Sequence, residues 1–528
     1  MHNFRTLSLA LGAVGAALVC AAQTPVTFSG VSSTAGNTPA TLYAVDLNND
    51  GITDILQDTG LSAPGFTVSL ANGDGTFKPP VHYSVASSSL IGINPMATGD
   101  FNNDGIVDIA VVLDRDASIA VFLGNGDGTF QAPKISTIVL PSGLTFTEGS
   151  AQAADFNADG KLDLVAWATN FANGAVPTTS ALFVLQGDGA GGFGNPHDVL
   201  DGPGFQPIFQ TLVGDYDSDG KPDIAATTYV SGVNGDPITT VHVLFGNDDF
   251  TFSDTTPYTT QSPFILGSGD LNSDGYTDLY GINGYAGIQQ LGIFYGNSAR
   301  TFSSYFLTLS STFPAGSSSD AANYMSQFTL ADFNGDGRMD LAVMGWDQAY
   351  TQAYVEFFLA TGVPGQFTLQ PVPLATTYKE DSAPIAGLFS GNFLTPDIGV
   401  NQSPNYGSPP QDFPSYLVAE VNQASSGWFG PCRYPKSGEG FNVCSPGTVR
   451  GSTATFNAAA NSYGQLRKIE LWVDGVKVSE QHHTWDQHAY FNFSSTFPPG
   501  VHDATFFASD IDNRLQRYDF TFTTTGAP

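Results

Sequence analysis

A nine-residue acidic phrase recurs six times along this chain. Each copy has Asp at positions 1, 5 and 9, Asp or Asn at position 3, and Gly at position 6. The six copies are DLNNDGITD from Asp46, DFNNDGIVD from Asp100, DFNADGKLD from Asp155, DYDSDGKPD from Asp215, DLNSDGYTD from Asp270 and DFNGDGRMD from Asp332. A phrase repeated this closely predicts that one structural unit is repeated along most of the chain.

The phrase predicts a calcium-binding loop. Calcium is a hard cation that binds several oxygen atoms, and side chains at positions 1, 3, 5 and 9 with the backbone carbonyl of position 7 can supply them. Gly at position 6 permits the sharp turn. We therefore expect about six calcium ions in a structural role. The predicted ligand residues are Asp46, Asn48, Asp50, Ile52, Asp54, Asp100, Asn102, Asp104, Ile106, Asp108, Asp155, Asn157, Asp159, Lys161, Asp163, Asp215, Asp217, Asp219, Lys221, Asp223, Asp270, Asn272, Asp274, Tyr276, Asp278, Asp332, Asn334, Asp336, Arg338 and Asp340.

These loops differ from the loops of helix–loop–helix calcium proteins. Such a loop needs a bidentate Glu at position 12 and a helix on each side. Position 12 is instead occupied by Gln57, Val111, Ala166, Ala226, Gly281 and Val343. Short apolar runs follow the loops directly, for example at 108–113, 163–168 and 340–345, and such runs are typical of buried strands. Each loop is therefore expected to join two β-strands.

The spacing of the loops indicates the size of the repeated unit. The first aspartates are 54, 55, 60, 55 and 62 residues apart. This period is long enough for four short strands with their turns and is typical of a propeller or a repeat array. A second phrase, often Gly-rich as in LGNGDGTF (123–130), follows each loop, and its Asn-Gly and Asp-Gly pairs favour hairpin turns. Each unit is interpreted as strand, calcium loop, strand, variable loop, strand, Gly-rich turn and strand.

A seventh unit is present but altered. FSGNFLTPDIGV (389–400) resembles the second copy, but its loop is three residues shorter and has Asn392 in place of the first Asp. No metal is expected there. This last unit lacks a fourth strand of its own, whereas TPVTFSGVSS (24–33) resembles the final strand of the first unit. We infer that the N-terminal strand completes the seventh unit and closes the ring.

Residues 24–428 resemble FG-GAP or VCBS repeats, which form the propellers of integrin α-subunits and occur in many secreted bacterial proteins. The six loops carry this resemblance. It implies an all-β fold, a seven-bladed β-propeller over residues 23–428 with calcium on one face, and metal roles for the six matching loops only. No inserted adhesion domain is visible, so an integrin-like heterodimer is not implied, and we expect a monomer.

The start of the chain predicts export. Residues 1–22 have the form of a secretory signal peptide, with Arg5 near the start, an apolar stretch at 7–19 and small residues at the end. The mature chain is expected to begin near Gln23 and to be secreted or displayed on the cell surface. Cys20 could alternatively be lipidated, although Val19 is an unfavourable residue just before it.

Two cysteines remain after the signal is removed, Cys432 and Cys444. In an exported protein they are expected to form a disulfide. The loop that they close is short, and the chain-entropy model gives a stabilisation of about 3 kcal/mol for it. Residues 429–447 are therefore expected to be a disulfide-stapled linker after the propeller.

The acidic phrase and its period disappear after Cys444. Strand-like runs follow, and Asp474-Gly475 predicts a hairpin turn between two of them. The runs are 453–458, 468–473, 489–494, 504–509 and 518–523. Residues 448–528 resemble bacterial immunoglobulin-like modules, which implies a small β-sandwich acting as a stalk, a spacer or a binder.

Charge narrows the set of partners. Acidic residues outnumber basic ones by 49 to 17, which gives a formal net charge of −32. Such a surface opposes nucleic acid and anionic membranes and favours solubility. No segment beyond the signal is apolar enough to span a bilayer. We therefore expect neither nucleic-acid binding nor a membrane span.

Candidate catalytic chemistry is scarce. His482, His483 and His488 are close in sequence, but adjacent strand residues point to opposite faces, which disfavours a joint metal site. The chain has no HExxH, GxSxG or P-loop motif and no cysteine nucleophile with a partner histidine. No catalytic residue is predicted, although some propeller enzymes draw catalytic residues from scattered loops.

Variable loops are expected on the face opposite the calcium loops. They span 169–180, 229–240, 281–290, 345–353 and 401–415. Aromatic rings occur there among amide and hydroxyl groups, a mixture suited to sugars or peptides, although ordinary loop packing also explains each ring singly. The aromatic residues of this expected ligand face are Phe171, Tyr229, Tyr285, Trp346, Tyr350 and Tyr406.

The sequence thus predicts a secreted calcium-binding β-propeller that acts as a binding or adhesion module for an extracellular glycan or protein. Two alternatives stay open. One is a carbohydrate-active enzyme, either a polysaccharide lyase or a hydrolase, on a propeller scaffold, and the other is a purely structural surface protein. A non-enzymatic role is favoured because no catalytic motif is visible.

Overall fold

The structure is a computed structural model, and β-strands are the only regular secondary structure in the residues that it describes. In these residues 39 strands form nine sheets, so the expected all-β fold is confirmed. The described residues are 28–34, 42–48, 50, 52–58, 65–85, 96–113, 117–141, 143–146, 151–169, 179–203, 206–231, 237–260, 264–269, 271–272, 276–285, 288–308, 327–331, 333–334, 339–346, 353–361, 363, 366–370, 374–375, 379–380, 385–387, 397–403, 416–422, 440–444, 448–449, 451–461, 466–482, 488–510 and 515–525.

Seven sheets lie between residues 28 and 422, and we number them in chain order. All strand pairs within them are antiparallel. Sheet 1 contains β2 (Leu42–Val45), β3 (Asp54–Asp58), β4 (Gly65–Ser69) and β5 (Val81–Ser84). Sheet 2 contains β6 (Met96–Gly99), β7 (Asp108–Leu113), β8 (Ser118–Phe122) and β9 (Lys134–Thr137). Sheet 3 contains β10 (Thr145–Phe146), β11 (Gln152–Ala154), β12 (Asp163–Thr169), β13 (Thr179–Gly187) and β14 (Phe193–Pro203).

The next four sheets follow the same plan. Sheet 4 contains β15 (Gln206–Gly214), β16 (Asp223–Ser231), β17 (Pro237–Gly246) and β18 (Phe252–Thr260). Sheet 5 contains β19 (Phe264–Gly269), β20 (Asp278–Tyr285), β21 (Ile288–Tyr295) and β22 (Ser303–Thr308). Sheet 6 contains β23 (Gln327–Ala331), β24 (Asp340–Trp346), β25 (Ala353–Ala360), β26 (Phe367–Leu369) and β27 (Leu374–Ala375). Sheet 7 contains β28 (Lys379–Glu380), β29 (Ile385–Gly387), β30 (Asp397–Ser403), β31 (Tyr416–Asn422) and the N-terminal strand β1 (Phe28–Thr34).

The strands that follow the first three acidic loops are buried along their whole length. Every residue of β3, β7 and β12 is buried, because these strands are paired along both edges and covered on both faces. The outermost strands β5 and β9 are mostly exposed. The continuous apolar runs after the loops therefore mark strands in the middle of their sheets.

Apolar clusters join each sheet to the next and return from sheet 7 to sheet 1. The clusters contain, among others, Leu56 and Ile109 (sheets 1 and 2), Ala110 and Leu164 (2 and 3), Val165 and Ile224 (3 and 4), Ala225 and Leu279 (4 and 5), Leu291 and Leu341 (5 and 6), Ala342 and Ile398 (6 and 7), and Ile55 and Ile385 (1 and 7). The inner strands β2 and β29 also contact each other. The seven sheets thus form a closed, propeller-like ring.

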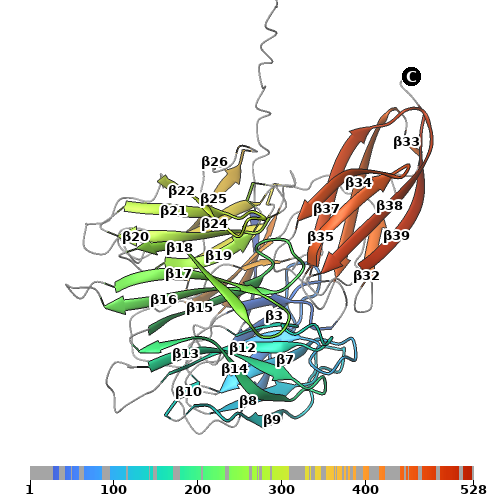
Figure 1. Ribbon diagram of the computed structural model, residues 1–528. Coiled ribbons are helices and arrows are strands. Elements are labelled where there is room, and N and C mark those ends of the chain that lie inside the picture. The colour runs from blue at the N-terminus through green and yellow to red at the C-terminus, as the bar shows by residue number, and fades with distance from the viewer. Residues whose placement is uncertain are drawn as a thin grey trace, which may run out of the picture.

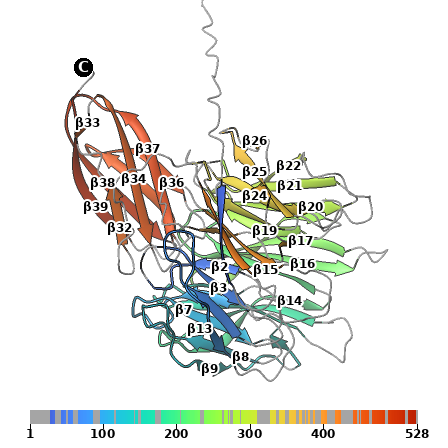
Figure 2. The same cartoon turned by 180° about the vertical axis from the view of Figure 1, so that it is seen from behind.

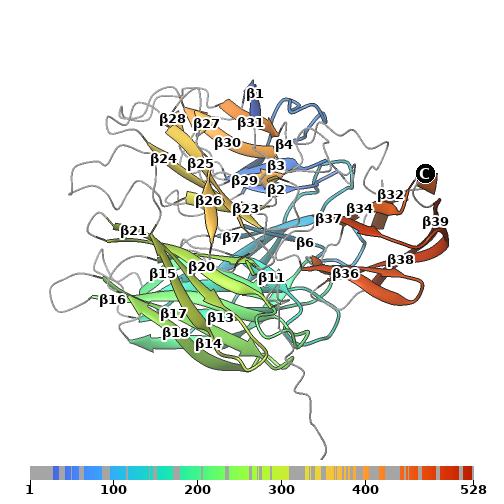
Figure 3. The ribbon, with the colours of Figure 1, turned by 90° about the horizontal axis from the view of Figure 1, so that it is seen from above.

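The N-terminal strand completes sheet 7, as predicted. β1 pairs antiparallel with β31 along its whole length, from Phe28 opposite Asn422 to Thr34 opposite Tyr416. Figure 3 shows β1 beside β31, at the edge of the sheet that also holds β30 and β28. The first and last strands of the ring are therefore hydrogen-bonded to each other, and β1 is the outer strand of sheet 7.

The C-terminal strands form two sheets beside the ring (Figures 1 and 2). One contains β32 (Gly440–Cys444), β34 (Thr453–Asn461) and β37 (His488–Thr496). The other contains β33 (Thr448–Val449), β39 (Leu515–Thr524), β38 (Gly500–Asp510), β35 (Leu466–Val473) and β36 (Val476–His482). A single apolar cluster between them includes Phe456, Leu471 and Phe506. The five predicted strands and the hairpin at Asp474-Gly475 are confirmed; both turn residues have positive φ, 51° and 78°.

One predicted boundary differs from the structure. We expected a linker to residue 447, but β32 pairs with β34 from Gly440 to Cys444, so strand pairing in the C-terminal unit begins before residue 448. The segment GFNVC is short and gives no turn signal by which to separate it from a linker.

Several sequence-based expectations lie outside the described residues. These concern the signal peptide with Cys20, the altered seventh loop with Asn392, and Cys432 of the expected disulfide; Cys444 is the last residue of β32. Within the residues that are described, no helix is long and apolar enough to cross a membrane.

Removing the N-terminal strand tests the closure of the ring. Deletion of residues 1–34 behind a substitute signal should lower the melting temperature by more than about 5 °C, because sheet 7 loses its outer strand and β31 is left as an unpaired edge. Deletion of residues 526–528 is the control and should leave the melting temperature nearly unchanged. Equal melting temperatures of the two truncated proteins would contradict the closing role of β1.

Candidate metal-binding loops

The six acidic loops occupy equivalent places in sheets 1 to 6, and we number them with their sheets. Each loop joins an inner strand to the second strand of the sheet, which begins at position 9 of the loop. Loops 1 to 4 are described at all five predicted ligand positions. In loops 5 and 6 the described ligand residues are Asn272, Tyr276, Asp278, Asn334 and Asp340, whereas Asp270, Asp274, Asp332, Asp336 and Arg338 lie outside the described residues.

Loop 2 illustrates how the side chains hold the turn. Asp100 accepts hydrogen bonds from the backbone amides of Asp104 (3.0 Å) and Gly105 (2.8 Å). Asn102 Oδ1 accepts a second bond from the Asp104 amide at 3.0 Å, and Asp104 Oδ1 accepts one from Ile106 at 2.9 Å. Gly105 has a φ of 83°, where only glycine is unstrained. The same bonds recur in loops 3 and 4, so the loop shape is specified by the chain itself.

The aspartate at position 9 has a second role that the sequence analysis missed. Asp108 is fully buried; its Oδ2 accepts the amide of Phe101 (2.9 Å), and its Oδ1 accepts the amide of Gly124 (2.8 Å), the first residue of the Gly-rich turn. All six loops repeat this pair of bonds at 2.8 to 3.1 Å, through Asp54, Asp108, Asp163, Asp223, Asp278 and Asp340. This carboxylate therefore ties the loop to the turn beside it.

A signal for this role was present in the sequence. Position 9 directly precedes a continuous apolar run, which is typical of a buried strand. Its side chain is therefore expected to be buried with that strand and not exposed on a turn. A buried carboxylate needs hydrogen-bond donors, and the backbone amides at position 2 and at the Gly-rich turn are the donors within reach.

Burial makes these carboxylates costly to ionise without a cation. Desolvation, opposed in part by the two amide bonds, raises the pKa of Asp108 and of Asp163 to about 7. Desolvation also raises the pKa of Asp54 and of Asp223 well above the ordinary value, and the carboxylates at other positions of each loop add to the effect. A bound divalent cation would reverse this preference.

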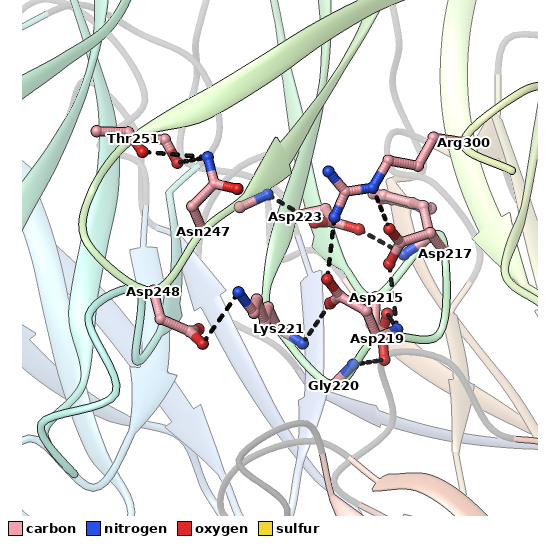
Figure 4. Close-up of polar contacts among 12 residues, drawn as sticks. Asp215, Asp217, Asp219, Gly220, Lys221, Asp223, Asn247, Asp248, Thr251 and Arg300 are labelled. Carbon is pink, nitrogen blue, oxygen red and sulfur yellow. Dashed lines mark hydrogen bonds and ion pairs between the residues drawn. The ribbon is translucent and has the colours of Figure 1, made fainter. Parts of the chain in front are cut away.

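The donor set of the loops fits a hard divalent cation, since it consists of carboxylate, amide and carbonyl oxygens only. In the described part of the chain, one group of three carboxylates converges: Asp215, Asp217 and Asp223 of loop 4 have oxygens within 4.8 Å of one another. Oxygens on opposite sides of a calcium ion lie about 5 Å apart. Figure 4 shows that Arg300, from the turn between β21 and β22, also reaches this loop.

Three aromatic residues of the expected ligand face are described, and they lie in strands. Tyr229, Tyr285 and Trp346 were expected in loops but lie within β16, β20 and β24, the second strands of sheets 4, 5 and 6. The strands extend further than predicted because pairing continues through these residues, for example from Tyr285 to Ile288. Phe171, Tyr350 and Tyr406 lie outside the described residues.

The three C-terminal histidines are not brought together by strand pairing. His482 is opposite Lys468 in the sheet of β35 and β36, whereas His488 is opposite Asn461 in the sheet of β34 and β37. His483 lies outside the described residues.

A row of three side chains across sheet 4 has the residue types of a proton relay. Thr228 Oγ1 lies 3.1 Å from His242 Nε2, and His242 Nδ1 lies 3.2 Å from Asp254 Oδ2. Thr228 and His242 are only 1% and 6% exposed, so a substrate has no access to the hydroxyl. This row satisfies buried polar groups between neighbouring strands and is not a catalytic site.

Comparison with known proteins supports the repeat. A model of the FG-GAP-like repeat matches residues 100–166 and 270–343, which include loops 2, 3, 5 and 6. The resemblance to FG-GAP repeats is therefore confirmed over those residues. No match to a curated protein is found.

Several solved structures are similar in fold. The BP39L lectin from Burkholderia pseudomallei has 15% identity and a TM-score of 0.48, over 76% of this chain and 100% of that one. An α-L-arabinofuranosidase from Fusarium graminearum has 11% identity and a TM-score of 0.39, over 62% and 92%. The Aleuria aurantia lectin, a six-bladed β-propeller, has 11% identity and a TM-score of 0.34, over 65% and 97%. At these values the likenesses carry no functional argument.

Replacing the position-9 aspartate tests its hydrogen-bonding role. Asp108→Ala should lower the free energy of unfolding by about 2–6 kcal/mol even in calcium-free buffer, because two buried amides lose their acceptor. The control is Asp127→Ala, which removes an exposed carboxylate that accepts from Thr129 in the neighbouring turn. Its expected cost is below about 1 kcal/mol. Denaturant unfolding of both variants in EDTA measures the difference, and similar costs would contradict a special role for Asp108.

Proposed function

We propose that this chain is a secreted, calcium-stabilised seven-bladed β-propeller, followed by an immunoglobulin-like sandwich, that binds an extracellular glycan or protein. The observation that carries the proposal is the ring of seven sheets, six of which have an acidic loop of the same sequence pattern between their first and second strands. A repeated scaffold of this kind presents its variable segments together on one face.

Calcium would act in the loops as a structural ion. The side chains at positions 1, 3, 5 and 9 and the carbonyl at position 7 would hold it, and it would supply the positive charge that a cluster of buried carboxylates requires. Each ion would bind within a single loop, but position 9 is also bonded to the turn between the third and fourth strands. Calcium would therefore stabilise the loop itself and also the turn between the third and fourth strands.

The ligand face would lie at the opposite ends of the strands from the acidic loops. The second strand of each sheet starts at the calcium loop, so its far end lies on the other side of the ring. Tyr229, Tyr285 and Trp346 occupy that far end in three consecutive sheets. Aromatic residues gathered at one end of a rigid scaffold are suited to stack on sugar rings or to anchor a peptide.

Removal of calcium tests the structural role. Calcium-free protein, prepared on a chelating resin, should melt well below the calcium-loaded protein, because each site saturated at a hundred times its Kd contributes about 2.7 kcal/mol. The pKa of Asp108 and of Asp163, raised to about 7, means that the folded calcium-free protein binds more protons than the unfolded chain between about pH 4 and 7. Its stability should therefore fall as the pH rises through this range.

The difference in melting temperature between the loaded and the calcium-free protein should accordingly be wider at pH 8 than at pH 5. Magnesium at the same concentration is the control for ionic strength. A melting temperature that is the same with and without calcium at pH 8 would refute the structural role.

Ligand binding can be tested with a glycan array and a set of immobilised extracellular matrix proteins. Trp346→Ala should weaken binding about tenfold or more, which is the loss of about 1.4 kcal/mol or more expected for an aromatic anchor, with little change in melting temperature. Tyr305→Ala is the matched control, since Tyr305 is 40% exposed on the outer strand β22. Normal binding by the folded Trp346→Ala protein would show that the proposed face is wrong. Depolymerisation of an array-positive polysaccharide would instead favour the enzyme alternative.

A further inference from the structure

Arg300 crosses from one sheet to the acidic loop of its neighbour. It lies in the turn between β21 and β22 of sheet 5, and its guanidinium reaches loop 4 of sheet 4 (Figure 4). Nε donates to Asp217 Oδ2 at 2.5 Å, and Nη2 donates to Asp219 Oδ2 at 3.0 Å. The guanidinium carbon also lies 5.1 Å from the centre of the Phe245 ring. Its two hydrogen bonds are made to positions 3 and 5 of the loop.

The backbone position of Arg300 is one that favours glycine. In the aligned turns of sheets 1 and 2 the residue before the final Thr-Phe pair is Gly75 or Gly128, with φ of 85° or 80°. Arg300 takes the same place with a φ of 56°. A non-glycine residue in this left-handed region carries a backbone cost. Phe250 takes the same place in sheet 4 with a φ of 63°, so this turn position accepts a side chain in two of the sheets.

Loop 4 carries one more carboxylate than each of the other five acidic loops. Position 3 is Asp217 here, whereas the other five loops have Asn. The Asp217 side chain is only 4% exposed, and its carboxylate belongs to the one converging trio of carboxylates in the described residues. A buried carboxylate without a cation is strongly disfavoured. The extra aspartate and the neighbouring arginine thus occur together.

The residues at the same place over the other described loops cannot act in this way. Gly128 and Gly191 have no side chain and lie beside Leu70 and Leu123, which precede the turns of sheets 1 and 2. Phe250 stacks on His197 of β14, with ring centres 3.9 Å apart. Loop 3 has a lysine of its own, Lys161, but its Nζ is 3.6 Å from Asp159 Oδ2 and both side chains are partly exposed.

The geometry points to Arg300 as the cation of loop 4, in place of calcium. Its two hydrogen bonds occupy carboxylate oxygens of positions 3 and 5 that a metal ion would need, and the charge is delivered by the chain itself. Loop 4 therefore binds no calcium while Arg300 is in place, and its contact with sheet 5 replaces the metal. This inference rests on the proposal that the other loops bind calcium.

Counting bound calcium tests the inference. The probe is calcium itself, measured by equilibrium dialysis with atomic emission on the full chain and on Arg300→Gly, which restores the glycine of the aligned turns. The variant should bind one more equivalent of calcium than the parent chain. Adding Asp215→Asn to Arg300→Gly should remove the additional equivalent, which locates it in loop 4. Lys134→Gln is the control, because Lys134 is an exposed cation that donates to the carbonyl of Ala190 and lies outside the predicted ligand positions; it should bind the same number of equivalents as the parent.

Thermal melting gives a second measure. Arg300→Gly should melt below the parent chain in calcium-free buffer and regain the difference when calcium is added, whereas Lys134→Gln should follow the parent in both buffers. Equal calcium counts for the parent and for folded Arg300→Gly would overturn the inference. If Arg300→Gly does not fold, Arg300→Gln supplies the same comparison. A parent chain that binds no calcium, together with a variant that binds none, would instead refute the proposed calcium role itself.

Discussion

The buried aspartate at position 9 of each loop is the interaction on which the ring depends. One carboxylate accepts the amide at the start of the loop and the amide at the start of the turn between the third and fourth strands, as Asp108 does with Phe101 and Gly124. The turn of the next sheet then bonds to the same loop, since Gly191 donates to the carbonyl of Phe101 at 2.9 Å. The hydrogen bonds of loop 2 thus continue from sheet 2 to the turn of sheet 3.

This arrangement requires positive charge or protons. The pKa of Asp108, raised to about 7 by burial, shows how strongly the site disfavours an isolated negative charge near neutral pH. A bound cation, as proposed for these loops, would relieve that cost without breaking the two amide bonds. The acidic phrase is therefore compatible with a well-packed ring even though it brings three or four carboxylates into each loop.

Loop 4 indicates a second solution to the same problem. A guanidinium held in a left-handed turn position can supply charge to carboxylates that face it and also connects two neighbouring sheets. A metal ion joins groups within one loop, whereas an arginine from the next turn joins groups from two sheets. With calcium in the other loops, as proposed, one repeated scaffold would combine metal-dependent and metal-independent contacts along its circumference.

The sequence by itself determined the repeated unit, its strands and the composition of the loops, because the loop phrase, the apolar runs and the Gly-rich turns are all local signals. It also predicted the pairing of β1 with β31, since sheet 7 lacked a strand that residues 24–33 resemble. Only the tertiary structure decided the double hydrogen bond of position 9, the strand positions of Tyr229, Tyr285 and Trp346, and the contact of Arg300 with Asp217. Each of these joins or extends segments that are separate in sequence, by 83 residues for Arg300 and Asp217, and so depends on how neighbouring strands and sheets pack.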